Sequence, residues 1–251
     1  MDKVDWHERF SVQAGWTKQL RQFLYQQVGI NEKSRILEVG CGTGVITSEL
    51  NDFTKIRAAG IDMQFERLLT AEAQDKKSDY ACADVFHLPY AENQFDFVIA
   101  HYLFLWLREP IQALSEIQRV LKPGGCMVSL AEPDYLARID NPQYLWTLGE
   151  MQTKALILQG ANPMAGRQLA SHFHQSGYKE VQYGISGFQT EAGQTPAWFE
   201  SEWKIIESDL LRYASPKELE VFQKMDLAAY QSGCRVRWVP TFYAYGKKHY
   251  E

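Results

Sequence analysis

Short apolar runs alternate regularly with amphipathic stretches between residues 34 and 132, and this alternation constrains the fold most strongly. Each run is brief and almost continuously apolar, as strands buried on both faces of a parallel sheet must be. The stretches between the runs have the character of helices that cross from one strand to the next. Strands are predicted at residues 35–39, 58–62, 79–83, 95–100 and 126–130. The chain is therefore expected to be an α/β protein with a mostly parallel sheet.

Further elements are predicted on both sides of this region. A helix over residues 10–28, with Leu20, Leu24 and Val28 on one face, is expected to cover the sheet. Beyond residue 132, helices are predicted near residues 142–160, 166–177, 198–211 and 215–230, and strands at 181–190 and 238–245. No linker or repeat marks a boundary, so residues 1–251 are expected to form one domain. Its parts are a helical cover (1–33), a core (34–132) and a helical lid with the late strands (133–251).

A glycine-rich turn, Glu38-Val39-Gly40-Cys41-Gly42-Thr43-Gly44, joins the first predicted strand to the following helix. Glycines let a backbone turn tightly and approach a ligand, and ligands bind at the carboxyl ends of parallel strands. Asp62 ends the second strand, where it can accept both hydroxyls of a ribose. Asp84 ends the third, where it can reach an adenine amino group while the Val85 amide donates to a ring nitrogen. Alone, the turn fits a plain connection and each Asp fits a cap, but together they indicate a site for an adenosine derivative.

With these motifs, the chain resembles the class I S-adenosylmethionine-dependent methyltransferases, in particular the group that includes the ubiquinone and menaquinone C-methyltransferases. The resemblance covers residues 34–132. It rests on the glycine turn and on Gly60-Ile61-Asp62, Ala83-Asp84, Phe95-Asp96-Phe97-Val98 and Leu121-Lys122-Pro123-Gly124-Gly125. It implies a Rossmann-like, seven-stranded sheet with an antiparallel last strand and helices on both faces. It also implies that core residues 34–132 bind S-adenosylmethionine as the cofactor and that the methyl acceptor is a small molecule.

The residues expected to bind this cofactor are Trp16, Glu38, Gly40, Cys41, Gly42, Gly44, Asp62, Met63, Asp84, Val85, Ala100 and His101. By the resemblance, Glu38 and the glycines hold the methionine part, and the backbone of Ala100 and His101 holds its amine. Trp16 is expected on the N-terminal helix, where its ring can face the sulfonium, with core packing as the alternative.

Two other functions remain open. A nicotinamide-dependent oxidoreductase needs the pattern G-x-G-x-x-G, whose third glycine lets the helix pack closely while its N-terminus faces a pyrophosphate. Position 45 is valine, and Glu38 would repel a pyrophosphate but suit an ammonium and a sulfonium. A non-catalytic S-adenosylmethionine-binding regulatory module is the second alternative, and the sequence does not separate it from an enzyme.

Candidates for the acceptor side lie at later strand ends and in the lid. His101 is the first candidate for a general base and Glu132 the second, although polar residues at strand ends also serve as loop hydrogen-bonders. The lid contains Trp198, Phe199, Trp203 and Tyr213. These rings either line a pocket for an apolar or planar acceptor or fill the buried face of the lid helices.

Composition excludes several other partners. A net charge of −5, a pI near 5.7 and the lack of a basic tract argue against nucleic acid. The four cysteines are widely scattered and lack metal-binding spacing, so no metal is expected. No leader and no membrane-spanning run is recognised, and the expected location is the cytoplasm. The oligomeric state is left open.

Overall fold

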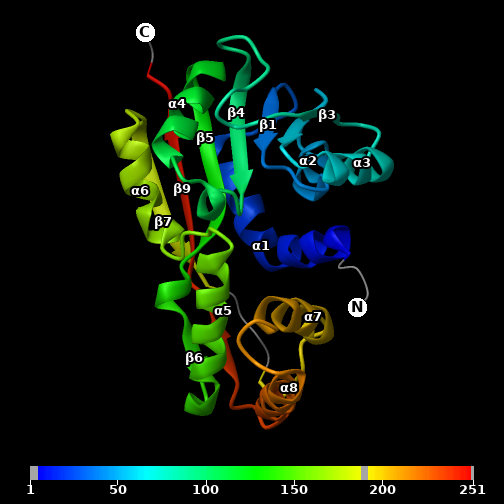
Figure 1. Ribbon diagram of the computed structural model, residues 1–251. Helices are drawn as coiled ribbons and strands as arrows, with labels where there is room; N and C mark the ends of the chain where they lie inside the picture. Colours follow the sequence, from blue (N-terminus) through cyan, green and yellow to red (C-terminus); the bar gives the residue numbers. More distant parts are fainter. Residues whose placement is uncertain (1–4, 188–191, 250–251) are drawn as a thin grey trace.

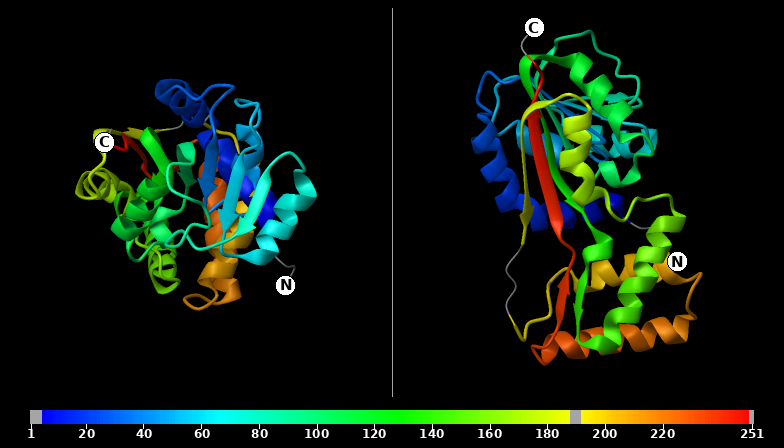
Figure 2. Two further views of the ribbon diagram at one scale, coloured as in Figure 1. Left: turned by 90° about the horizontal axis from the view of Figure 1, so that it is seen from above. Right: turned by 90° about the vertical axis from the view of Figure 1, so that its left-hand side faces the viewer.

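A computed structural model describes residues 5–187 and 192–249 of the chain. It has an upper part built on a large sheet and a lower lobe made mostly of helices, with the first half of helix α1 (Trp6–Val28) running between them (Figure 1). In the side view, two long strands descend from the upper part towards the lobe (Figure 2). The predicted N-terminal helix is confirmed, although it begins at Trp6 rather than at residue 10.

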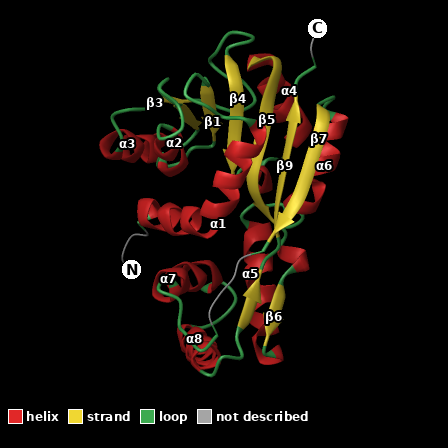
Figure 3. Cartoon of the chain, turned by 180° about the vertical axis from the view of Figure 1, so that it is seen from behind, coloured by secondary structure: helices red, strands yellow, loops and turns green. Residues whose placement is uncertain are grey.

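The upper part is a seven-stranded sheet in the order β3-β2-β1-β4-β5-β9-β7 (Figure 3). The strands are β1 (Ile36–Val39), β2 (Ala59–Asp62), β3 (Asp79–Cys82), β4 (Phe95–His101), β5 (Leu121–Pro133), β7 (Lys179–Ser186) and β9 (Thr241–Lys247). The first five pair in parallel, whereas β9 runs antiparallel to both of its neighbours, β5 and β7. The predicted seven-stranded sheet with an antiparallel last strand is therefore confirmed.

Helices cover both faces of this sheet because successive strand residues point to opposite sides. Ile36 of β1 packs with α1 and with α2 (Val45–Leu50) on one face. Its neighbour Leu37 packs with α4 (Pro110–Val120) and α6 (Ala165–Gln175) on the other. Helix α3 (Phe65–Gln74) lies beside β2 and β3. Strands buried on both faces explain the continuous apolar runs in the sequence.

The lower lobe has a hydrophobic core of its own. The lobe consists of β6 (Ile139–Asn141), α5 (Trp146–Leu158), α7 (Phe199–Leu210), α8 (Pro216–Gln231) and β8 (Val236–Trp238). It also has 3-10 turns at Tyr135–Ala137 and Gln143–Leu145. Leu148, Trp203 and Leu219 bring the three helices together in this core. At the start of α8 the Ser215 side chain accepts a hydrogen bond from the Glu218 amide, and the Glu218 side chain accepts one from the Ser215 amide. The predicted helix start is confirmed as a capping box.

Three predicted strands differ from the structure, and the one predicted at 126–130 is only the middle of β5, which runs from Leu121 to Pro133. Residues 238–245 were expected to form one strand, but β8 pairs with β6 in a separate two-stranded sheet and β9 begins only at Thr241. Pro240 lies between them and has no backbone N–H to continue a ladder. The strand predicted at 181–190 is β7, which ends at Ser186, and residues 188–191 lie outside the described residues. Within the described ranges, no helix combines the length and apolar character needed to cross a bilayer.

Candidate active site

The carboxyl ends of four parallel strands meet at one edge of the sheet. Val39 of β1 pairs with Ile61 of β2 and with Ala100 of β4, and Asp62 of β2 pairs with Cys82 of β3. This register places the glycine turn after β1 between the ends of β2 and β4. The edge therefore brings together most of the residues that the sequence singled out.

The glycine turn is held against the end of β2. Gly40, Gly42 and Gly44 have φ angles of +72°, +55° and +78°, which only glycine adopts readily. The Gly42 amide donates a 2.9 Å hydrogen bond to Oδ2 of Asp62. The amide of Cys41, itself buried, donates to the Ile61 carbonyl at 2.8 Å. Asp62 therefore fixes the turn from the neighbouring strand, as a residue beside the expected ribose position would.

Glu38 lies underneath this turn and is only 2% exposed. The hydroxyl of Thr47 on α2 donates a hydrogen bond to its carboxylate. Burial raises the pKa of Glu38 to about 7, and the Thr47 hydrogen bond opposes that rise. A cationic ligand at the turn would favour the ionised carboxylate, so this group is suited to an ammonium or sulfonium.

The N-terminal part of α1 lies across the turn. A Cβ atom added at Gly42 would come within 2.7 Å of Cε2 of Phe10, and His7 Nδ1 lies 3.1 Å from the hydroxyl oxygen of Thr43. The guanidinium of Arg67 on α3 lies 5.4 Å from the centroid of the Phe10 ring. The predicted helix began at Phe10, so the sequence reasoning did not identify Phe10 or His7 as site residues.

The adenine side of the expected site is more open. Asp84 is exposed after β3, and its Oδ1 accepts a 3.0 Å hydrogen bond from the Phe86 amide. Val85 is buried at 8% exposure, whereas Met63, after β2, is 68% exposed. In this structure Asp84 organises its own loop, and its carboxylate remains accessible.

His101 ends β4 and contacts α1. Its Nε2 lies 2.8 Å from the hydroxyl oxygen of Thr17, which also accepts a 2.7 Å hydrogen bond from Arg21. Burial, together with the positive charge of Arg21, lowers the pKa of His101 to about 3. The imidazole is therefore neutral at physiological pH.

Glu132 lies near the end of β5 and is fully buried. Its Oε1 accepts hydrogen bonds from the amides of Leu103 at 2.7 Å and Phe104 at 2.9 Å, and its Oε2 accepts one from Leu105 at 3.2 Å. Burial raises the pKa of Glu132 to about 8, and the three backbone hydrogen bonds oppose that rise. The carboxylate thus holds the segment that follows β4.

Comparisons with known proteins identify the kind of domain in which this edge lies. A model of the methyltransferase domain family matches residues 37–129, the span that contains the glycine turn and the strands β1 to β4. The chain contains a class I methyltransferase domain.

Two curated relatives extend the similarity of this methyltransferase domain. An uncharacterized methyltransferase of Schizosaccharomyces pombe is 33% identical over 153 residues, which is 56% of this chain and 55% of that protein. The chain thus spans about half the length of this relative. A demethylmenaquinone methyltransferase of Lactiplantibacillus plantarum is 26% identical over 204 residues, 72% of this chain and 85% of that protein.

A solved structure shows the same fold beyond the domain match. A putative methyltransferase from Bacillus halodurans superposes with a TM-score of 0.62, covering 92% of this chain and 98% of that chain at 14% identity. At that identity the likeness establishes the fold alone. It includes the lower lobe, which lies outside the residues matched by the family model.

The lower lobe presents aromatic rings to α1. The ring of Trp16 meets the edge of Trp198 at 5.7 Å between centroids. Phe199 and Trp203, at 2% and 3% exposure, lie in the lobe core, and Tyr213 is 37% exposed. The structure thus places Trp16 against the lobe. Among the described residues, no group of three His, Cys, Asp or Glu side chains is placed to hold a metal ion.

Proposed function

We propose that this methyltransferase binds S-adenosylmethionine across the glycine turn and transfers the methyl group to a small-molecule acceptor. The observation that supports this most strongly is the pairing of buried Glu38 with Asp62 around a turn whose glycines carry no Cβ. Two carboxylates beside a close backbone approach suit a cationic adenosine derivative better than a dinucleotide with its pyrophosphate.

The residues present fit this cofactor. Glu38 would face the methionine end, Asp62 would accept the ribose hydroxyls, and Asp84 with the Val85 amide would meet the adenine. Phe10 lies over Gly42 of the turn and Leu103 over Gly40, where Cδ1 of Leu103 would lie 2.8 Å from an added Cβ. Both are flexible side chains rather than backbone, so they can move aside without breaking a strand or the turn.

S-adenosylmethionine supplies a methyl group that its sulfonium already activates for in-line displacement. The contribution required of the protein is alignment of donor and acceptor, which can provide about 7–11 kcal/mol of the barrier. Residues of the turn and of the β2 end fix the donor, and the segment after β4 borders the acceptor side. Rigid strand ends are well suited to such positioning.

We infer that His101 and Glu132, the two candidates for a base, act mainly as positioning residues. The pKa of about 3 makes His101 a weak proton acceptor at neutral pH. The Glu132 carboxylate is committed to three backbone amides and has no exposed surface. His101 ties β4 to α1 through Thr17, and Glu132 shapes the loop between β4 and α4.

Calorimetric titration with S-adenosylhomocysteine, with NAD in parallel, tests the cofactor assignment. Asp62→Ala removes charge-assisted hydrogen bonds of about 1.5–3 kcal/mol each. Loss of two such bonds should weaken adenosylhomocysteine binding roughly 10²–10⁴-fold. Because Asp62 also holds the Gly42 amide, Asp62→Asn provides a milder companion variant, and Asp52→Ala at an exposed position is the control.

Binding of NAD without binding of adenosylhomocysteine would overturn the proposal in favour of an oxidoreductase. Incubation with methyl-labelled S-adenosylmethionine and a metabolite extract then separates an enzyme from a regulatory module. The proposal expects labelled small molecules in the extract. A protein that binds the donor tightly but labels no acceptor is better explained as a binding module.

A further inference from the structure

A cluster of buried charges lies where the lower lobe meets α1. Ion pairs join four arginines to three carboxylates: Arg9, Arg138, Arg235 and Arg237 with Asp140, Glu202 and Asp226. The cluster therefore carries one uncompensated positive charge. The nearby Asp209 accepts a hydrogen bond from Gln159 and forms no ion pair with these four arginines within the described residues.

One half of the cluster, formed by Arg138, Arg235, Asp140 and Asp226, is paired more closely and holds the lobe together, although Nη2 of Arg235 has no hydrogen-bond partner among the described residues. Arg138 donates two hydrogen bonds to Asp140, at 2.6 Å and 3.0 Å. Arg235 donates to Asp226 at 2.5 Å, and Asp226 also accepts a hydrogen bond from the indole of Trp203. With the ion pair between Arg235 and Asp140, these contacts link β6 and the residue before β8 to α7 and α8, which gives this half a structural role.

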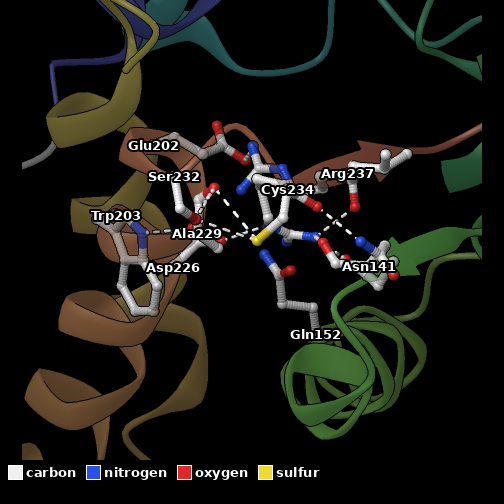
Figure 4. A network of polar contacts seen from close by, with 12 residues as sticks. Asn141, Gln152, Glu202, Trp203, Asp226, Ala229, Ser232, Cys234 and Arg237 are labelled. Carbon is white, nitrogen blue, oxygen red and sulfur yellow. Dashed lines mark hydrogen bonds and ion pairs between the residues drawn. The ribbon is translucent and has the colours of Figure 1, made fainter. Parts of the chain in front are cut away.

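The other half, formed by Arg9, Arg237 and Glu202, is incompletely paired. Glu202 of α7 is shared by Arg9 of α1 and Arg237 of β8. Figure 4 shows Glu202 and Arg237, whose Oε1 and Nη2 atoms are 3.3 Å apart. The Arg237 side chain is only 10% exposed, yet its Nη1 finds no hydrogen-bond partner among the described residues. The buried indole N–H of Trp16 is likewise unpartnered within the described part of the chain. A buried donor left without a partner is costly, so an added acceptor that reaches these two donors would bind favourably.

These two donors belong to one cluster of arginines and indole rings between α1 and the lobe. The Arg9 guanidinium lies 5.2 Å from the Trp16 ring centroid, and that of Arg237 lies 5.0 Å from the Trp198 ring centroid. The two indole rings meet each other at 5.7 Å. Thr17, next to Trp16 in the chain, contacts His101 at the end of β4.

The geometry points to a binding site for the carboxylate or other oxyanion of a small, planar acceptor. The anion accepts hydrogen bonds from Arg237 and from the indole of Trp16, and it shares Arg9 with Glu202. The planar guanidinium fork binds oxyanions in a bidentate manner, and the indole rings offer faces for the rest of the molecule. Glu202 acts as the internal anion that holds both arginines until the ligand enters. The role of this ligand as methyl acceptor rests on the proposed function, but the anion site itself does not.

Fluorine NMR titration of the full chain with 4-fluorobenzoate tests the anion site. The neutral 4-fluorobenzamide has nearly the same shape and is the matched probe. We expect the benzoate to bind and the benzamide to bind at least about tenfold more weakly, since it lacks charge-assisted hydrogen bonds. Competition by inorganic phosphate would show that the site accepts oxyanions generally, and its failure would restrict the site to carboxylates.

Two substitutions should change the affinity in opposite directions. Arg237→Gln should weaken benzoate binding about 10- to 150-fold. Glu202→Gln removes the competing carboxylate and should tighten it about tenfold. Glu207→Gln, at an exposed position of the same helix, is the control. If Arg237→Gln fails to fold, the Glu202→Gln variant distinguishes an anion site from a purely structural ion pair. A purely structural ion pair gives no reason for tighter anion binding in that variant.

Equal binding of benzoate and benzamide, or unchanged benzoate affinity in Glu202→Gln, would overturn the anion site. Each variant is also titrated with S-adenosylhomocysteine, whose affinity should stay within about twofold of the wild type because its expected contacts lie at the glycine turn. A protein that binds adenosylhomocysteine but shows no preference for the anion contradicts only this inference. A protein that prefers the anion but ignores adenosylhomocysteine contradicts only the proposed function.

Discussion

Replacing Glu132 distinguishes a positioning carboxylate from a catalytic base. Glu132→Ala leaves three buried amides, those of Leu103, Phe104 and Leu105, without their acceptor. Each unsatisfied buried donor costs about 1–3 kcal/mol, so the variant should lose about 3–9 kcal/mol at pH 5. That loss is comparable to the total stability of an ordinary domain. Glu132→Gln keeps one oxygen for the first two amides and should lose only about 1–3 kcal/mol.

Because the Glu132 carboxyl group titrates, the difference in the free energy of unfolding between the wild type and each variant depends on pH. Its pKa is raised to about 8 in the folded chain, from an ordinary value of 4.5. The folded state therefore retains a proton that the unfolded state releases, and its stabilising contribution is lost as pH rises from 4.5 through 8. At about 1.4 kcal/mol per pH unit, the wild type loses up to about 5 kcal/mol from this group. Neither variant has this titration, so both should lose less stability with rising pH.

Urea unfolding at pH 5 and pH 8 measures both effects, with the exposed Glu150→Gln as the control. The expected order at pH 5 is wild type, then Glu132→Gln, then Glu132→Ala. A fully stable Glu132→Ala would refute the positioning role. A Glu132→Gln protein with wild-type stability and unchanged adenosylhomocysteine affinity, but no methyl transfer to an acceptor found in extract, would support the base instead.

Three further substitutions test the turn, its cover and a lobe helix. Gly42→Ala places a Cβ at a φ of +55° and 2.7 Å from Phe10, and it should lower the free energy of unfolding in urea by about 1–2 kcal/mol or more. Phe10→Ala uncovers the turn and should tighten adenosylhomocysteine binding in calorimetry, whereas weaker binding would mean that the ring forms part of the bound site. Ser215→Ala removes the capping box of α8 and should cost about 0.5–2 kcal/mol in urea unfolding, and an unchanged midpoint would contradict that cap.

The sheet and the first part of the site were predictable because local sequence encodes them. Strands buried on both faces leave continuous apolar runs, so the predicted first four strands agree with β1 to β4 to within one residue at each end. Parallel strands share one carboxyl edge, which is why Gly42 and Asp62, at the ends of two different strands, could be expected to meet. Their 2.9 Å contact confirms the spatial part of that expectation.

Features that depend on long-range partners were not predictable in the same way. The roles of Glu132 and Arg237 depend on the loop after β4 and on α7, and no local pattern identifies those neighbours. The small β6–β8 sheet joins segments nearly a hundred residues apart. The break within the run 238–245 did have a local signal, Pro240, which the prediction of a single strand did not take into account. One local signal was missed: Asp5 caps α1 by accepting hydrogen bonds from the amides of His7 and Glu8, and it marks the true start of that helix.

Helix α1 shows why the site and the lobe were hard to connect from sequence. Residues seven apart lie on the same face of a helix. Phe10 and Thr17 are such a pair, and they meet the glycine turn and His101. Arg9 and Trp16 are another, and they meet the lobe at Glu202 and Trp198. A helix covered on two sides needs no single apolar stripe. Periodicity therefore revealed the part of α1 that covers the sheet and gave no sign of the part that joins the cofactor edge to the lobe.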